Sequence, residues 1–151
     1  MQKQPQTKHT DAVTYIDFKN ENQLCASCGD DGQIYVFNYQ SFRHEFHFQR
    51  DPADPNPERV KICKFLADTD ILVSADLEGY LHFWCVSIPH HPKKGQLILS
   101  IRDQSESDVG EKAYFPIRAM DYDKETKILF TGDEMGYMNK WDLSQLIQKM
   151  E

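Results

Sequence analysis

A histidine, a serine and an aspartate near the start of the chain have the residue types of a hydrolase. His9, Ser27 and Asp31 would supply a general base, a nucleophile and an orienting carboxylate. All three also fall at fixed positions of an internal repeat, described below, which explains them without catalysis. We therefore interpret them as structural residues and expect no catalytic site.

Cys25 and Cys28 have the C-x-x-C spacing of a metal or redox pair. Both lie in an expected strand, where residues three apart point to opposite faces, so they are poorly placed to share a zinc ion. Cys63 falls in register with the apolar residues Ile16 and Met120 of the other units, and Cys85 ends an apolar strand. We expect all four cysteines to be buried apolar side chains and expect no metal or cofactor. The adjacent His90 and His91 are a weak ligand pair in a proline-flanked loop and are interpreted as solvated.

Three charged residues share a register on the first strand of each unit, namely Asp17, Lys64 and Asp121. An enzyme on this scaffold would need acid and base groups at such equivalent places. The charges alternate in sign along the register. This favours ion pairing between neighbouring units, or lining of a solvated channel, over catalysis.

The repeat consists of a small hydroxyl residue, a turn residue four places later and a large aromatic residue six places after that. Gly32, Gly79 and Gly136 each follow the turn residue, where a two-residue hairpin turn needs a residue that tolerates positive φ. An apolar strand precedes each set in the same register. The three sets are Ser27, Asp31 and Phe37; Ser74, Glu78 and Trp84; and Thr131, Met135 and Trp141.

The first unit, residues 8–38, resembles a WD repeat, the blade unit of β-propellers, and the third unit keeps the signature dipeptide Trp141-Asp142. The resemblance implies an all-β fold of β-propeller blades, each a four-stranded antiparallel sheet. In this family a histidine, the hydroxyl, the turn aspartate and the tryptophan form one structural hydrogen-bonded tetrad. Phe37 lacks a donor in the first unit, so no unit here is complete. The other units have Asn56 and Glu78, or Ala113 and Met135, at the histidine and aspartate positions.

The length of 151 residues, at about 45 residues per blade, provides three blades. Because a propeller closes with roughly four to eight, we expect an incomplete arc, completed by more of the same chain or by another chain. Fourth strands are expected at 42–48 and 96–102. The expected organisation is a polar lead at 1–11 that carries His9; blade 1 at 12–48; a proline-rich linker at 49–59; blade 2 at 60–102, with a long loop at 87–95; a polar linker without a fold of its own at 103–116; and blade 3 at 117–151, without an obvious fourth strand and ending in a helix-like segment.

The net charge of −7 and the pI near 5.3 argue against nonspecific binding of nucleic acid, which needs a basic face. No apolar run approaches the roughly twenty residues of a membrane span, and no signal segment begins the chain. We therefore expect a cytoplasmic protein that binds neither nucleic acid nor membrane.

In WD-repeat propellers, partner proteins commonly bind around the start of the first strand and beside the turn aspartate. Transferred to this sequence, Lys61 and Arg118, with Arg59 beside them, predict a basic ridge for an acidic protein segment. The alternative is that these are ordinary solvated charges at strand ends. The transferred positions are Ala12, Thr14 and Asp30; Arg59, Lys61 and Leu77; and Pro116, Arg118 and Glu134.

The segment from Thr131 to Ser144 also resembles the divergent blades of large ciliary WD-repeat proteins. That resemblance implies an architectural role in the cilium or cytoskeleton. Three interpretations remain open: a noncatalytic scaffold module of a larger propeller, which we favour; a short chain that completes a partner's open propeller or associates with itself; and an enzyme on a propeller.

Overall fold

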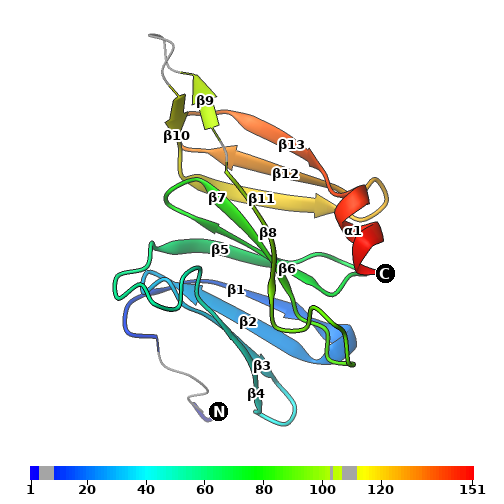
Figure 1. Cartoon of the computed structure of the whole chain (residues 1–151). Helices are drawn as coiled ribbons and strands as arrows, with labels where there is room; N and C mark the ends of the chain where they lie inside the picture. The colour runs from blue at the N-terminus through cyan, green and yellow to red at the C-terminus, as the bar shows by residue number, and fades with distance from the viewer. Residues whose placement is uncertain (4–8, 103, 107–111) are drawn as a thin grey trace.

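The computed structural model describes residues 1–3, 9–102, 104–106 and 112–151, in which three antiparallel blade sheets lie side by side and a separate two-stranded sheet precedes the third (Figure 1). Within each blade the strands are neighbours in chain order, so every blade is a meander. Blade 1 contains β1 (Val13–Lys19), β2 (Leu24–Gly29), β3 (Ile34–Asn38) and β4 (His44–Phe48). Blade 2 contains β5 (Val60–Phe65), β6 (Ile71–Asp76), β7 (Tyr80–Cys85) and β8 (Leu97–Arg102). Blade 3 contains β11 (Ile117–Asp123), β12 (Ile128–Asp133) and β13 (Met138–Asp142).

The expected class, an incomplete arc of propeller blades, is confirmed, and blade 3 differs from the others as expected. Its third strand is followed by helix α1 (Ser144–Met150) rather than by a fourth strand. The Asp142 carboxylate accepts hydrogen bonds from the amide and the hydroxyl of Ser144, which favours a helix start at this point. No helix among the described residues is long and apolar enough to cross a bilayer.

Two local expectations are wrong. The fourth strand of blade 1 begins at His44 rather than at Phe42, because the Asn38 side chain holds a turn over Gln40 and Ser41 in which Phe42 takes a left-handed φ of 61°. The polar segment 103–116 contains a short antiparallel pair, β9 (Gln104–Glu106) and β10 (Lys112–Tyr114). Its polar sequence carries no apolar alternation from which strands could be predicted.

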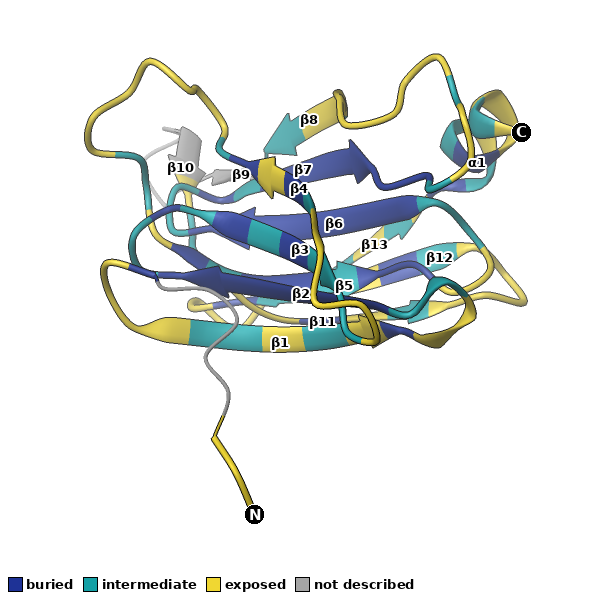
Figure 2. Cartoon of the chain, turned by 90° about the horizontal axis from the view of Figure 1, so that it is seen from below, coloured by how far each residue is buried: buried dark blue, intermediate teal, exposed yellow. Residues whose placement is uncertain are grey.

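Apolar packing between sheets holds the arc together. One buried cluster joins blade 1 to blade 2, where Phe48 of β4 stacks on Trp84 of β7 with ring centroids 4.7 Å apart. A second joins blade 2 to blade 3 and includes Ile147 of α1. Figure 2 shows that burial is concentrated in β2, β6 and β7, while the outer edges are exposed. Blade 2, covered on both sides, is therefore the centre of the structure.

Polar contacts also cross the first interface. The Thr14 hydroxyl donates to the Val60 carbonyl at 2.6 Å, and the Asp17 carboxylate accepts from the Phe65 amide at 2.9 Å. Lys61 pairs with Asp30 of blade 1 at 2.5 Å. The first two bonds join β1 to β5, the innermost strands of the first two blades, and the ion pair joins β5 to the turn after β2.

Candidate functional site: polar networks at the turn face

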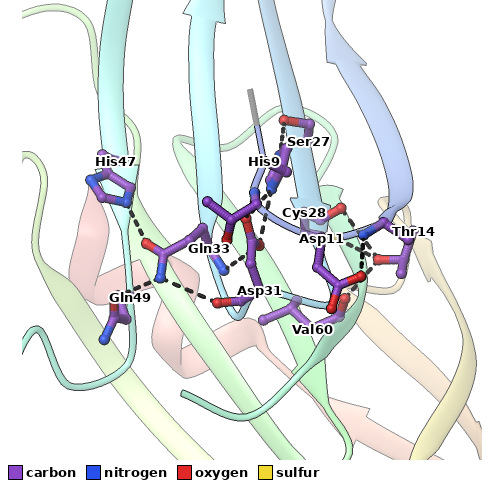
Figure 3. A network of polar contacts seen from close by, with 12 residues as sticks. His9, Asp11, Thr14, Ser27, Cys28, Asp31, Gln33, His47, Gln49 and Val60 are labelled. Atoms are coloured by element: carbon purple, nitrogen blue, oxygen red, sulfur yellow. Dashed lines mark hydrogen bonds and ion pairs between the residues drawn. The ribbon is translucent and has the colours of Figure 1, made fainter. Parts of the chain in front are cut away.

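His9, Ser27 and Asp31 meet at one end of blade 1 (Figure 3). The Nδ1–H of His9 donates to the carboxylate of Asp31, with both oxygens at 3.0 Å, because an ionised carboxylate only accepts. With its proton on Nδ1, the ring accepts at Nε2 from the Ser27 hydroxyl, at 2.9 Å. The side chains of His9 and Asp31 are only 2% and 3% exposed. The trio therefore fixes the chain before β1 to the turn after β2.

The Asp31 carboxylate is held in its ionised form. Burial opposes ionisation, but hydrogen bonds from His9 and from the backbone amides of Gln33 and Thr10 outweigh it, so the pKa of Asp31 lies below its ordinary value of 3.8. A carboxylate that accepts from three donors serves as a clamp for the turn.

The network of blade 1 continues to the linker. The amide group of Gln33 donates to the side-chain oxygen of Gln49 at 2.7 Å (Figure 3). Gln49 donates in turn to the carbonyls of Asp51 and Asp54. A Cβ added at Gly32 would lie 2.6 Å from the Pro57 ring, and Gly32 has a φ of +75°. The proline-rich linker is thus packed directly on the first turn.

Blade 2 builds its network from other residues. Asp76 accepts at one oxygen from the amides of Glu78 and Tyr80, at 2.9 and 3.1 Å. Its other oxygen accepts from His82 Nε2 at 3.3 Å, and His82 Nδ1 accepts from the Ser100 hydroxyl at 2.7 Å. Both Asp76 and His82 are buried. The histidine therefore comes from a strand of the blade rather than from the segment before it.

Blade 3 repeats the aspartate of blade 2. Asp133 accepts at one oxygen from the amides of Met135 and Tyr137, at 3.0 and 3.1 Å. Its second oxygen is buried and has no partner among the described residues. Asp76 and Asp133 both stand where blade 1 has Gly29, opposite the first residue of the innermost strand.

The exchange of glycine for aspartate has a steric cause. A Cβ at Gly29 would lie 2.8 Å from the Ala12 carbonyl oxygen and 2.9 Å from His9 Nδ1. The His9 ring therefore fills the space that an aspartate side chain fills in the other two blades. The position at the end of the second strand therefore carries either an aspartate side chain or a glycine that leaves space for the histidine ring.

The repeat register has Glu78 and Met135 at the turn-aspartate position of blades 2 and 3, whereas the carboxylates that accept the turn amides, Asp76 and Asp133, lie two residues earlier. Glu78 forms a surface ion pair with Arg50 at 3.0 Å, and Met135 is 62% exposed. Asn56, at the expected histidine position, is exposed in the linker. The missed signal is the sequence Asp-x-x-Gly at Asp76 and Asp133, where the glycine marks the turn and the aspartate precedes it by three.

The aromatic positions of the repeat differ in whether their side chain can donate a hydrogen bond. Trp84 Nε1–H donates to the Ser74 hydroxyl and Trp141 Nε1–H to the Thr131 hydroxyl, both at 2.9 Å. Phe37 has no donor, and the Ser27 hydroxyl bonds His9 instead. Each of the three hydroxyl residues thus has one aromatic or imidazole partner. Gly32, Gly79 and Gly136 have φ values of 75°, 82° and 89°, as their turn positions predict.

The predicted partner-binding positions lie together around the turns. In each blade the residue after the second strand donates its amide to the residue before the first strand: Asp30 to Ala12, Leu77 to Arg59 and Glu134 to Pro116, at 2.9 to 3.1 Å. Two of the three cations of the predicted ridge are neutralised there, since Lys61 pairs with Asp30 and Arg118 with Glu134. The nine positions form one face, but their charges are largely balanced.

The other candidate sites are structural as well. The side chain of Lys64 reaches Asp121 of blade 3 at 3.5 Å, an ion pair between blades, while Asp17 caps a backbone amide. His91 Nε2 donates to the Met150 carbonyl at 3.1 Å, so the loop at 87–95 holds the end of α1. His90 is exposed.

All four cysteines are free and buried. Burial raises the pKa of Cys25 to about 11, whereas hydrogen bonding with Cys63 lowers the pKa of Cys28 and raises that of Cys63. No three histidine, cysteine or acidic side chains gather as metal ligands would within the described residues.

Comparison with known proteins agrees with this architecture. Residues 2–38 match the family model of the WD domain, G-beta repeat. The crystal structure of the C-terminal WD40 domain of Sif2 superposes with a TM-score of 0.69 at 17% identity, covering 93% of this chain and 34% of that chain. This chain therefore spans about a third of that domain's length. No curated protein matches the chain by sequence. The first unit therefore matches a WD repeat, and the chain as a whole has the fold of an open arc of three β-propeller blades.

Proposed function

We propose that this chain is a noncatalytic scaffold module, a three-blade part of a WD-repeat propeller that holds partner proteins in a larger assembly. The observation that carries the proposal is the exposure of both ends of the arc. An end blade whose apolar face is uncovered has the surface of a blade interface without its neighbour.

The first end is the outer face of blade 1. Val13, Ile16 and Phe18 of β1 are 50%, 55% and 56% exposed. Val60, Cys63 and Phe65 occupy the same register in β5, and they are 6%, 0% and 9% exposed because blade 1 covers them. The β1 residues are therefore apolar at positions that a preceding blade would bury.

The second end is the outer face of blade 3. Phe130 and Met138 are 36% and 75% exposed, whereas Val73 and Leu81, in the same register of blade 2, are fully buried against blade 3. An apolar hollow of about 360 Å³ lies on this face and includes Ala119, Phe130 and Met138.

The histidine and aspartate side chains of the two networks that could act as catalytic acids or bases are enclosed, which supports the noncatalytic part of the proposal. His9 and Asp31 are enclosed and saturated with structural hydrogen bonds, and His82 and Asp76 are buried. A group that catalyses must reach its substrate. The place in the ciliary axoneme, and with it a cytoskeletal location, rests on the resemblance of the third unit alone and is the most specific form of this proposal. A cytoplasmic location is part of the same proposal.

Self-association of the 151-residue chain tests the proposal. We expect light scattering after size exclusion to show oligomers or aggregates, and hydrogen exchange to be fast in β1 and β12. Ile16→Lys with Phe18→Lys, or Phe130→Lys with Met138→Lys, should reduce that association.

Phe42→Lys is the matched control, because Phe42 is 53% exposed in a turn that no neighbouring blade would cover. A monomer with slow exchange in all three blades, unchanged by the face variants, would contradict the proposal. A discrete dimer with protected β1 would instead favour closure between copies.

Binding at the turn face is tested separately by the variants Lys61→Glu and Arg118→Glu. Because both cations are already paired within the face, we expect less than a threefold loss of partner affinity. A large loss with a steep salt dependence would restore the basic ridge as the recognition element.

A further inference from the structure

We infer that the free edge of β13 and the groove beside it form a docking site for an extended acidic segment of a partner protein, which adds to blade 3 as a fourth strand. The inference rests on the proposed scaffold function, but it does not depend on which chain closes the arc.

Backbone pairing shows the vacancy in blade 3. In blade 1, β3 is paired with β4, and in blade 2, β7 is paired with β8. In blade 3, β13 is paired with β12 on one side, and no described strand pairs with its other edge. A strand edge with unpaired amide and carbonyl groups is a template for an added strand.

A groove of about 620 Å³ lies beside this edge, between β8 of blade 2 and α1. Ile98 and Ile101 of β8, Trp141 of β13 and Leu146 of α1 provide its apolar lining. Side chains on one face of an added strand would point into it, since alternate residues of a strand share a face. The partner segment should therefore carry apolar residues at every second position.

The rim of the groove has the opposite charge to the chain as a whole. Lys93, Lys140 and Lys149 border it and are exposed, and none of them forms an ion pair with a described residue. The single carboxylate of the lining, Asp142, is engaged by Ser144. Three unpaired lysines on a chain of net charge −7 select an acidic partner.

The register of blade 2 predicts where one charge would fall. Phe83 of β7 lies opposite Leu99 of β8, and Lys140 holds the position of Phe83 in β13. The residue of an added strand opposite Lys140 should thus be Asp or Glu, because opposite charges across a strand pair stabilise it.

Two other occupants fit the groove less well. The lead of this chain, residues 1–8, contains Lys3 and Lys8 and no acidic residue, so the lysine rim would repel it. Symmetric pairing of two copies through β13 would bring one lysine rim against the other, because a twofold interface presents the same surface twice.

The test uses the whole 151-residue chain and a fluorescein-labelled eight-residue peptide in which Val and Glu alternate. We expect saturable binding by fluorescence anisotropy that weakens with salt, and slower hydrogen exchange at residues 138–142. A peptide of alternating Val and Lys should not bind.

Combined Lys93→Glu, Lys140→Glu and Lys149→Glu changes should weaken binding at least tenfold. Lys124→Glu is the matched control and should change affinity by less than twofold, because Lys124 is exposed in the β11–β12 turn of the same blade, outside the groove lining. Circular dichroism of each variant establishes that it is folded.

Equal binding of the Val-Lys peptide, unchanged affinity of the triple variant, or binding without protection of β13 would overturn the inference. So would binding of phosphatidylserine vesicles that the Val-Glu peptide does not displace. The variant Ile16→Lys with Phe18→Lys, on the far face of blade 1, should leave peptide binding unchanged, which separates this result from the test of the proposed function.

Discussion

Blade 1 and blade 2 hold the same turn with different carboxylates. In blade 1, Asp31 lies within the turn and His9 arrives from the segment before β1. In blade 2, Asp76 lies at the end of β6, two positions earlier in the repeat, and His82 comes from β7. What the two blades share is a buried carboxylate that accepts turn amides and an imidazole that bonds it. The network is preserved although the residues that build it have moved.

The residue at the end of the second strand and the histidine before the first strand depend on each other. A carboxylate at the end of the second strand and a histidine before the first strand would occupy the same space, as the short distances from Gly29 show. A blade with glycine at this position accommodates the histidine, and a blade with aspartate there must obtain its imidazole from elsewhere or do without one. Blade 3, with Asp133, leaves one carboxylate oxygen without a described partner.

The largest expected effect comes from removing the blade 2 carboxylate. Asp76→Ala leaves two turn amides and His82 without their acceptor in a buried site, and we expect a loss of about 3 kcal/mol in the free energy of unfolding. Urea denaturation followed by circular dichroism measures it. Asp121→Ala, at an 88% exposed carboxylate, is the control and should cost at most about 0.5 kcal/mol. Equal losses in the two variants would refute the role given to Asp76.

A smaller loss of stability is expected from a substitution at Gly29, the position in blade 1 that leaves space for the His9 ring. Gly29→Ala places a methyl group against the Ala12 carbonyl and His9, so we expect a loss of about 2 kcal/mol by the same denaturation assay. Gly132→Ala is the matched control, because its nearest contact would be the Ala119 Cβ at an ordinary 3.9 Å. If Gly29→Ala were as stable as the wild type, steric exclusion would not explain why glycine stands at this position.

The aromatic donors should contribute less. Trp141→Phe removes the donor to Thr131 and gives blade 3 the aromatic residue of blade 1, at an expected cost of about 1 kcal/mol. Trp141→Phe combined with Thr131→Val removes both partners and should cost little more than the single change. Strong additivity of the two single losses, measured as a double-mutant cycle, would show that the two side chains do not interact.

The smallest expected effect is on how the stability of the chain depends on pH through Asp31 of blade 1. The pKa of Asp31 is lower in the folded chain than its ordinary value of 3.8, so folding favours the ionised form. The stabilisation is fully present above that ordinary value and is lost as the pH falls through the lower folded pKa. Between roughly pH 5 and pH 2 the wild type should lose more stability than Asp31→Asn, which has no group to titrate there. Parallel curves for the two proteins in thermal melts would contradict the assignment.

Much of the fold could be predicted because the repeat reflects constraints between residues that are close in the sequence. The glycines at positive φ, the alternating apolar strands and the hydroxyl-to-tryptophan spacing each reflect a constraint within one blade, and the structure has Trp141 bonded to Thr131 as that spacing implies. The turn carboxylates of blades 2 and 3 could not be predicted from the repeat, because Asp76 and Asp133 lie two positions before its turn residue. In blade 2, Glu78 keeps the charge and the register of Asp31 but lies at the surface, where it pairs with Arg50 from the preceding linker.

The all-β class, the three repeats, the tight turns and the lack of a fourth strand directly after β13 could be predicted from the sequence, because these follow from backbone preferences and side-chain alternation over a few residues. The folded structure was needed to show which carboxylate clamps each turn, which charges of the turn face neutralise one another, and where unpaired lysines gather beside an open edge. Those outcomes depend on distances between residues far apart in the chain, such as Lys61 with Asp30 and Lys93 with Lys140, and no local pattern encodes them.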